Sequence, residues 1–149
     1  KSNLSMLTVF FTNDDEDDRL FFEEAIEAGG VEVSLTTFKN GKELMNYLYK
    51  EDTLLPDLLF LDLNMPVKNG IECLEEIKNT DKLKDFIIAI YSTSSSEKDI
   101  EETFVKGANI YINKPSNFKQ LKKIIDKVLK INWQYPITNL NRNTFLLRL

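Results

Sequence analysis

Side chains suited to phosphoryl chemistry occur at four separate places, each directly after a short hydrophobic run. Residues 13–18 include five acidic side chains, Asp62 follows a second run, Ser92 a third and Lys114 a fourth. Carboxylates are oxygen ligands that Mg²⁺ prefers, and an aspartate can itself become phosphorylated. A lysine and a hydroxyl can neutralise and hydrogen-bond phosphoryl oxygens. These residues together would be able to accept a phosphoryl group, provided that the fold brings them to one place.

Hydrophobic runs and helical stripes alternate along the chain. Five short runs predict strands, at Leu7–Thr12, Val31–Leu35, Leu58–Leu61, Phe86–Tyr91 and Ile110–Ile112. Stripes with helical spacing follow them, at Phe21–Ile26, Leu44–Leu48, Ile71–Ile77, Ile100–Phe104 and Phe118–Val128. This alternation predicts a doubly wound α/β fold, a parallel sheet with helices on both faces. Ligands of such sheets bind beyond the carboxyl ends of the strands, where the four polar segments lie.

Composition narrows the class of protein. The 149 residues are enough for one domain with a sizeable core. A net charge of −5 argues against direct binding to nucleic acid, and no hydrophobic run is long enough to cross a membrane. Cys73 is the one cysteine, so no intrachain disulfide can form, and a reducing, cytoplasmic location is expected. The absence of histidine removes the commonest general base and the usual zinc ligand.

The polar segments resemble the receiver domains of two-component response regulators. The marks of that family, in order, are the acidic cluster at 13–18, Asp62 with Met65-Pro66 and Gly70, Ser92, and Lys114-Pro115 after Gly107-Ala108. The resemblance runs from Leu7 to about Ile131. It implies a flavodoxin-like receiver fold, with five parallel strands in the order 2-1-3-4-5 and five helices. We therefore expect a receiver domain at residues 1–131, and an extension at 132–149 without an effector domain.

The resemblance also implies a role for each candidate site residue. Asp62 would accept the phosphoryl group, and Ser92 and Lys114 would bind its oxygens. The implied cofactor is Mg²⁺. Its ligands would be Asp14, Asp62, the backbone carbonyl of Asn64 and, through a water molecule, Asn13. Ser92 would act as the switch hydroxyl and Tyr111 as the switch aromatic residue.

Position 13 departs from the family pattern, in which two acidic residues usually stand where this chain has Asn13 and Asp14. An asparagine amide can still hold a metal-bound water, but it contributes no charge. In an alternative register the acidic pair would be Asp14 and Asp15. We prefer the first register because Arg19 then aligns with the first helix of the family.

Two local structures are expected beside the site. Acidic residues favour the start of a helix, so we expect Asp17 or Asp18 to cap the first helix while Asp14 turns toward the metal. The resemblance further implies a cis peptide bond between Lys114 and Pro115, which would aim the lysine ammonium at Asp62.

The implied function is signalling controlled by phosphorylation. A sensor histidine kinase or a phosphotransfer protein would be the donor, and the chain would not be a turnover enzyme. A downstream protein would read the face formed by the fourth helix, fifth strand and fifth helix. If the chain is not a monomer, we expect a homodimer through that face or through the C-terminal tail.

Two other classes of function compete with this one, namely a constitutive binding module and a phosphatase or small-molecule enzyme with the same topology. A degenerate receiver that binds its partner constitutively is favoured only by Asn13. A phosphatase of the haloacid-dehalogenase type needs a second aspartate two residues after the nucleophile, where this chain has Asn64. A flavodoxin needs a Gly- and hydroxyl-rich phosphate loop after the first strand, and the acidic cluster replaces it.

The tail at 132–149 is rich in hydrophobic residues but has no clear periodicity. We expect Trp133 to pack near the end of the fifth helix, because it extends the hydrophobic stripe that ends there. Residues 139–143 are expected to be less ordered, since they offer little hydrophobic area. The alternative is that the tail is an arm that contacts a partner.

Overall fold

The computed structural model describes residues 6–131 and 145–147. All strands belong to one parallel sheet, in the order β2-β1-β3-β4-β5-β6. Their bounds are β1 Leu7–Thr12, β2 Val33–Phe38, β3 Leu58–Leu61, β4 Ile87–Ser92, β5 Ile110–Asn113 and β6 Leu146–Leu147. The predicted order 2-1-3-4-5 is confirmed, and a short sixth strand is added at the β5 edge.

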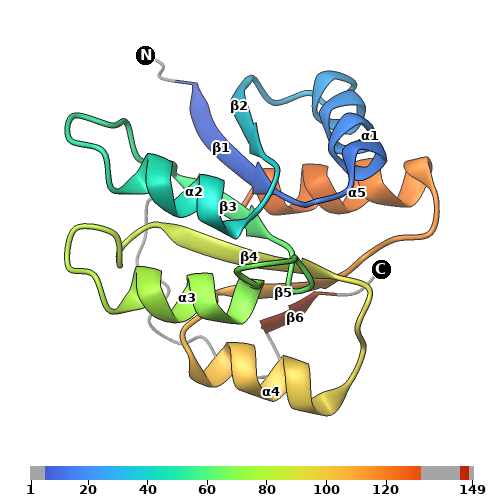
Figure 1. Ribbon diagram of the computed structural model, residues 1–149. Coiled ribbons are helices and arrows are strands. Elements are labelled where there is room, and N and C mark those ends of the chain that lie inside the picture. The colour runs from blue at the N-terminus through green and yellow to red at the C-terminus, as the bar shows by residue number, and fades with distance from the viewer. Residues whose placement is uncertain (1–5, 132–144, 148–149) are drawn as a thin grey trace.

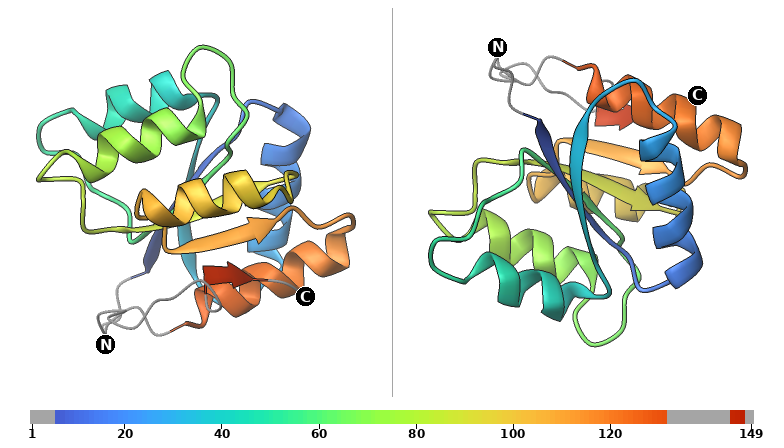
Figure 2. Two further views of the ribbon diagram at one scale, coloured as in Figure 1. Left: turned by 90° about the horizontal axis from the view of Figure 1, so that it is seen from below. Right: turned by 90° about the horizontal axis from the view of Figure 1, so that it is seen from above.

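In the described part of the chain, five helices cover the sheet on both faces, as the alternating pattern predicts (Figures 1 and 2). Their bounds are α1 Glu16–Glu27, α2 Gly41–Leu48, α3 Gly70–Lys78, α4 Glu97–Val105 and α5 Phe118–Leu129. Helices α1 and α5 pack on one face, and α2, α3 and α4 pack on the other. Because every strand runs in the same direction, all carboxyl ends of the strands lie at one edge of the sheet.

Consecutive residues of the central strands supply the two cores in turn. Phe10 packs into the core on the α2 and α3 side, whereas Phe11 faces the opposite core and stacks on Phe22 of α1, with 3.9 Å between ring centroids. All four residues of β3 are buried. An uninterrupted hydrophobic run is typical of a strand covered on both faces, so these strands hold the residues that follow them in fixed positions.

The second strand begins later than the sequence suggests. The prediction of Val31–Leu35 was wrong at both ends, because β2 covers Val33–Phe38 and Val31 lies in the bend that follows α1. Alternation over only three hydrophobic positions could not fix the boundary. The strand is an edge strand, as expected, with intermediate and exposed residues alternating along most of it.

The end of the tail packs on the domain. Strand β6 pairs with β5, and Phe145 directly before it is completely buried. The Phe145 ring lies 5.2 Å from that of Phe104 and 6.0 Å from that of Tyr111, measured between centroids. Trp133 and residues 139–143, for which the sequence makes predictions, lie outside the described residues.

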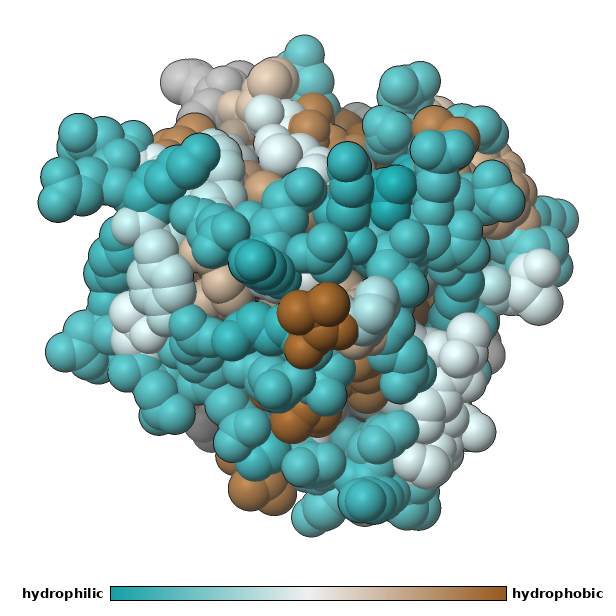
Figure 3. Space-filling view, viewed as in Figure 1, coloured by the Kyte–Doolittle hydropathy of each residue, from teal (hydrophilic) through white to brown (hydrophobic). Residues whose placement is uncertain are grey.

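The described surface is largely polar. The face seen in Figure 3 is mostly hydrophilic, with hydrophobic residues in small separate groups. Within residues 6–131 and 145–147, no helix is both long enough and hydrophobic enough to cross a membrane. Cys73 is completely buried in the core, and this burial raises the pKa of its thiol to about 12.

Candidate functional site

The four polar segments meet at the carboxyl edge of the sheet, around an open hollow of about 430 Å³. The residues that line it are Asn13, Asp14, Asp15, Asp18, Asp62, Asn64, Thr93 and Lys114. They follow β1, β3, β4 and β5, whose pairing fixes their relative positions. The hollow therefore combines carboxylates, a hydroxyl and one ammonium group, but the hydroxyl that lines it is that of Thr93 and not that of the predicted Ser92.

Asp62 stands directly after β3 and is held by its own loop. The backbone N–H of Asn64 donates a hydrogen bond to Asp62 Oδ1 at 3.3 Å, and the N–H of Gly70 donates to the carbonyl of Leu63 at 3.0 Å. A Cβ atom on Gly70 would lie 2.2 Å from the Asp62 carbonyl oxygen, closer than any real contact. Glycine at position 70 thus allows the start of α3 to pack against the backbone that carries Asp62.

The surroundings of Asp62 disfavour its negative charge. Burial is the main cause that raises its pKa, to about 6, and the charges of Asp14 and Asp18 raise it further. The Asn64 N–H and the Lys114 ammonium act in the opposite direction without cancelling the rise. A cation placed between Asp62 and Asp14 would stabilise both carboxylates.

The donor set fits Mg²⁺. Asp14 and Asp62 offer carboxylate oxygens, Asn64 lines the same hollow, and the open side leaves room for the water molecules that this ion usually retains. The described part of the chain contains no cluster of three or more Asp, Glu, His or Cys side chains arranged to bind a metal. A magnesium ion here would instead be held by two carboxylates, completed by neutral oxygens.

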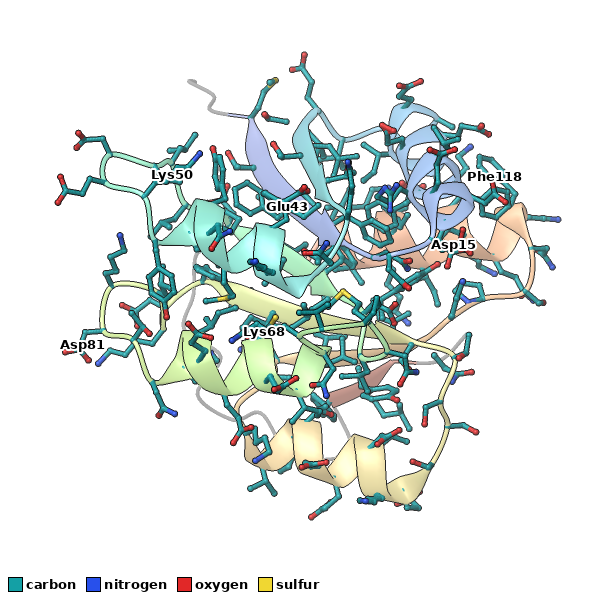
Figure 4. All side chains as sticks on the ribbon, viewed as in Figure 1. Asp15, Glu43, Lys50, Lys68, Asp81 and Phe118 are labelled. Carbon is teal, nitrogen blue, oxygen red and sulfur yellow. The ribbon has the colours of Figure 1, made fainter. Side chains whose placement is uncertain are left out.

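The acidic segment begins α1 in a different way from the prediction. The N-cap is Asp15, which is labelled in Figure 4. Its side chain accepts a hydrogen bond from the N–H of Asp17 at 2.9 Å. Neither Asp17 nor Asp18 caps the helix, because the helix starts at Glu16 and both belong to its first turn. Asp14 is exposed and lines the hollow.

Asn13 is buried, and the protein itself uses both of its polar side-chain atoms. Its Oδ1 accepts a hydrogen bond from the N–H of Asp15 at 2.9 Å, and its Nδ2 donates to Asp18 Oδ2 at 3.3 Å. Arg19 fixes the same residue by donating from Nη1 to the Asn13 carbonyl at 2.8 Å. The asparagine is thus a structural part of the loop as well as a lining residue of the hollow.

Lys114 reaches the hollow from the end of β5. Its backbone N–H donates to the Ser92 carbonyl at 2.7 Å, and its ammonium forms an ion pair with Asp18. The predicted cis bond to Pro115 was wrong, because this peptide bond is trans. Trans is the lower-energy isomer even before proline, and from it the side chain already reaches the hollow.

Ser92 and Tyr111 are linked through the loop after β4. The Ser92 hydroxyl is buried and accepts a hydrogen bond from the N–H of Ser94 at 3.1 Å. The hydroxyl of the completely buried Tyr111 donates to the carbonyl of the same Ser94 at 2.7 Å. A movement of Ser92 would therefore shift Ser94, and with it the carbonyl that accepts the hydrogen bond from Tyr111.

Three residues that the preferred register did not assign to the site line the hollow, namely Asp15, Asp18 and Thr93. Thr93 lines the hollow where Ser92 does not, and Asp18 contacts both Lys114 and Asn13. No residue spacing singles out Asp18, because Asp14 precedes the N-cap Asp15 and helical spacing does not relate the two residues. Any of the five acidic side chains in the run could have been a solvated helix start.

Comparison with known proteins points to one family. Residues 9–126 match the response regulator receiver domain. The response regulator Rcp1 of Synechocystis sp. is 28% identical over 124 residues, covering 80% of this chain and 84% of Rcp1. The polar-differentiation response regulator DivK of Brucella anthropi is 28% identical over 122 residues, covering 82% of this chain and 95% of DivK.

Solved structures agree with the sequence match. The phosphorylated cyanobacterial phytochrome response regulator RcpA superposes with a TM-score of 0.77 and 34% identity, covering 83% of this chain and 91% of RcpA. The Mn²⁺-bound form of Rcp1 has a TM-score of 0.77 and 26% identity, covering 87% of this chain and 96% of Rcp1. Sequence match, strand order and the converging site residues lead to one conclusion: this chain belongs to the response regulator receiver domain family of two-component systems.

Proposed function

We propose that this receiver accepts a phosphoryl group on Asp62 from the phosphohistidine of a sensor histidine kinase or a phosphotransfer protein. The observation that carries the proposal is the position of Asp62, which stands in one hollow with Asp14, Asn64, Thr93 and Lys114. The phosphorylated RcpA and the Mn²⁺-bound Rcp1 among its structural relatives support phosphorylation and metal binding in receivers of this fold.

Asp14, Asp62 and the backbone carbonyl of Asn64 are the proposed ligands of Mg²⁺. Asn13 Oδ1 has a second lone pair beyond the one used by Asp15, and would contact the ion through a water molecule. The bound ion would offset the negative charge that gathers on the phosphoryl oxygens.

The transfer needs one nucleophile and two groups that bind the phosphoryl oxygens. Asn64 engages Oδ1 of Asp62, so Oδ2 is available to attack phosphorus. A new P–O bond forms as the P–N bond to the donor histidine breaks, and the imidazole leaves with the bonding electrons. Lys114 would pair with a phosphoryl oxygen and Ser92 would donate a hydrogen bond to another. The resulting movement of Ser92 would pass through Ser94 to Tyr111.

Output would then depend on a shifted population of conformations at the face formed by α4, β5 and α5, which a downstream protein binds. We propose a cytoplasmic location, which agrees with the single buried cysteine, and a signalling role rather than that of a turnover enzyme. Residues 1–131 would form the receiver, and residues 132–149 an extension of it.

Incubation with acetyl phosphate tests this function, with intact mass as the readout. The wild-type protein should gain the mass of one phosphoryl group in Mg²⁺ and none in EDTA, and Asp62→Asn should gain none in either. Asp57→Asn is the matched control, because Asp57 lies before β3 at the opposite edge of the sheet. It should be phosphorylated as the wild type is. An unmodified wild-type protein in Mg²⁺ would favour a constitutive binding module instead.

A further inference from the structure

Among the described residues, Asp18 is the one whose side chain forms an ion pair with the Lys114 ammonium. Its Oδ2 forms the ion pair with the Lys114 ammonium and also accepts the hydrogen bond from Asn13 Nδ2 at 3.3 Å. The two charged side chains are shielded, with 20% of Asp18 and 25% of Lys114 exposed. Water and salt therefore screen this pair less than they screen a fully exposed one.

Asn13 and Asp18 are chemically matched. An asparagine at position 13 can donate a hydrogen bond to the Asp18 carboxylate, whereas an aspartate there would place a second negative charge within hydrogen-bond distance of it. The neutral residue at position 13 and the additional carboxylate at position 18 therefore form one unit. Its effect is that a negative charge faces Lys114 from the first turn of α1.

We propose that Asp18 is a positioning residue, which holds the Lys114 ammonium at the side of the hollow until a phosphoryl group on Asp62 competes for it. This inference rests on the proposed function. A phosphoryl group carries a charge of about −1.5 to −2, whereas a carboxylate carries −1. The phosphoryl group therefore attracts the Lys114 ammonium more strongly than Asp18 does. The contact with Asp18 raises the energetic cost of phosphorylation, and it returns Lys114 to its resting position when the phosphoryl group leaves.

The resting contact can be tested without phosphorylation, by NMR of the lysine ammonium and ε-methylene groups in metal-free protein. Asp18→Asn keeps the shape of the side chain and removes its charge, so the Lys114 signals should shift and the ammonium should exchange faster with water. Asp17→Asn is the matched control, since Asp17 is an exposed neighbour in the same first turn. It should leave the signals in place. Unchanged Lys114 signals in Asp18→Asn would overturn the inference.

The competition can be tested by titrating beryllium fluoride, an analogue of the phosphoryl group, in the presence of Mg²⁺. Asp18→Asn should bind it about fivefold more tightly than the wild type, because Lys114 no longer has to leave a partner, and Asp17→Asn should change the affinity less than twofold. In a Lys114→Met background the gain from Asp18→Asn should disappear. Equal or weaker binding by Asp18→Asn would overturn the inference, and so would a gain that persists without Lys114. A wild-type protein that does not bind the analogue contradicts the proposed function, while the NMR experiment still decides the role of Asp18.

Discussion

Two opposing requirements meet at Asp62. As the proposed phosphoryl acceptor it must be ionised, yet it stands at the end of a buried strand and is partly removed from water. Burial and the nearby Asp14 raise its pKa to about 6, although Lys114 lies in the same hollow. A carboxyl group whose pKa is higher in the folded than in the unfolded protein destabilises the fold above that pKa. The effect disappears at low pH, where the group is protonated in both states.

Asp62→Asn should therefore stabilise the metal-free protein. At pH 7.5 in EDTA we expect a melting temperature about 3–5 °C higher than that of the wild type, from a gain of about 1–2 kcal/mol. The difference should narrow as the pH falls from 6 toward 4. Mg²⁺ should raise the melting temperature of the wild type more than that of the variant. A variant less stable than the wild type in EDTA at pH 7.5 would show that the ionised Asp62 carboxylate does not destabilise the folded protein.

The start of α3 controls the loop that carries Asp62, through the close approach of Gly70. Gly70→Ala would push its Cβ into the carbonyl of Asp62 and to within 2.7 Å of Leu63 Cα, so backbone must move. We expect a loss of about 2 kcal/mol or more in the free energy of unfolding, with slower Mg²⁺-dependent phosphorylation. Gly30→Ala is the control, because no atom beyond its two chain neighbours lies within 4 Å of the position of its Cβ. Equal denaturation midpoints for the two variants would contradict this interpretation.

Strand β6 adds residues 146 and 147 to the edge of the sheet, next to Tyr111 on β5. Because Phe145 is completely buried between Phe104 and Tyr111, Phe145→Ala should cost about 2 kcal/mol or more and lower the melting temperature. Val105→Ala on α4 removes a side chain that is 73% exposed and should change little. If Phe145→Ala melts as the wild type does, the tail contributes nothing to the stability of this edge.

At the scale of the whole molecule, regular patterns could be predicted and local geometry could not. Buried runs such as Leu58–Leu61 gave the central strands and their order, since hydrophobic periodicity and family resemblance pointed the same way. Features that are short, or that depend on tertiary contacts, could not be predicted from the sequence. The two residues of β6 have no periodicity to detect, and Val67 adopts a φ of 70°, a left-handed conformation that a β-branched residue rarely takes.

The candidate site shows the same division. Side-chain types identified Asp62, Asp14 and Lys114, and the fold brings them together in one hollow. The ion pair between Lys114 and Asp18 depends on how α1 meets the end of β5, which residue spacing does not encode. The sequence therefore indicated the chemistry of the site better than the resting contacts of its residues.

The most direct test of the account is to locate the phosphoryl group by chemistry. After reaction with acetyl phosphate and Mg²⁺, borohydride reduces an aspartyl phosphate to homoserine, and peptide mass spectrometry then identifies the converted residue. We predict homoserine at position 62 and at no other aspartate, with no conversion when EDTA replaces Mg²⁺. Conversion at Asp14 or Asp18 with Asp62 intact would contradict the assignment of the acceptor, and the absence of any conversion in Mg²⁺ would contradict phosphorylation itself.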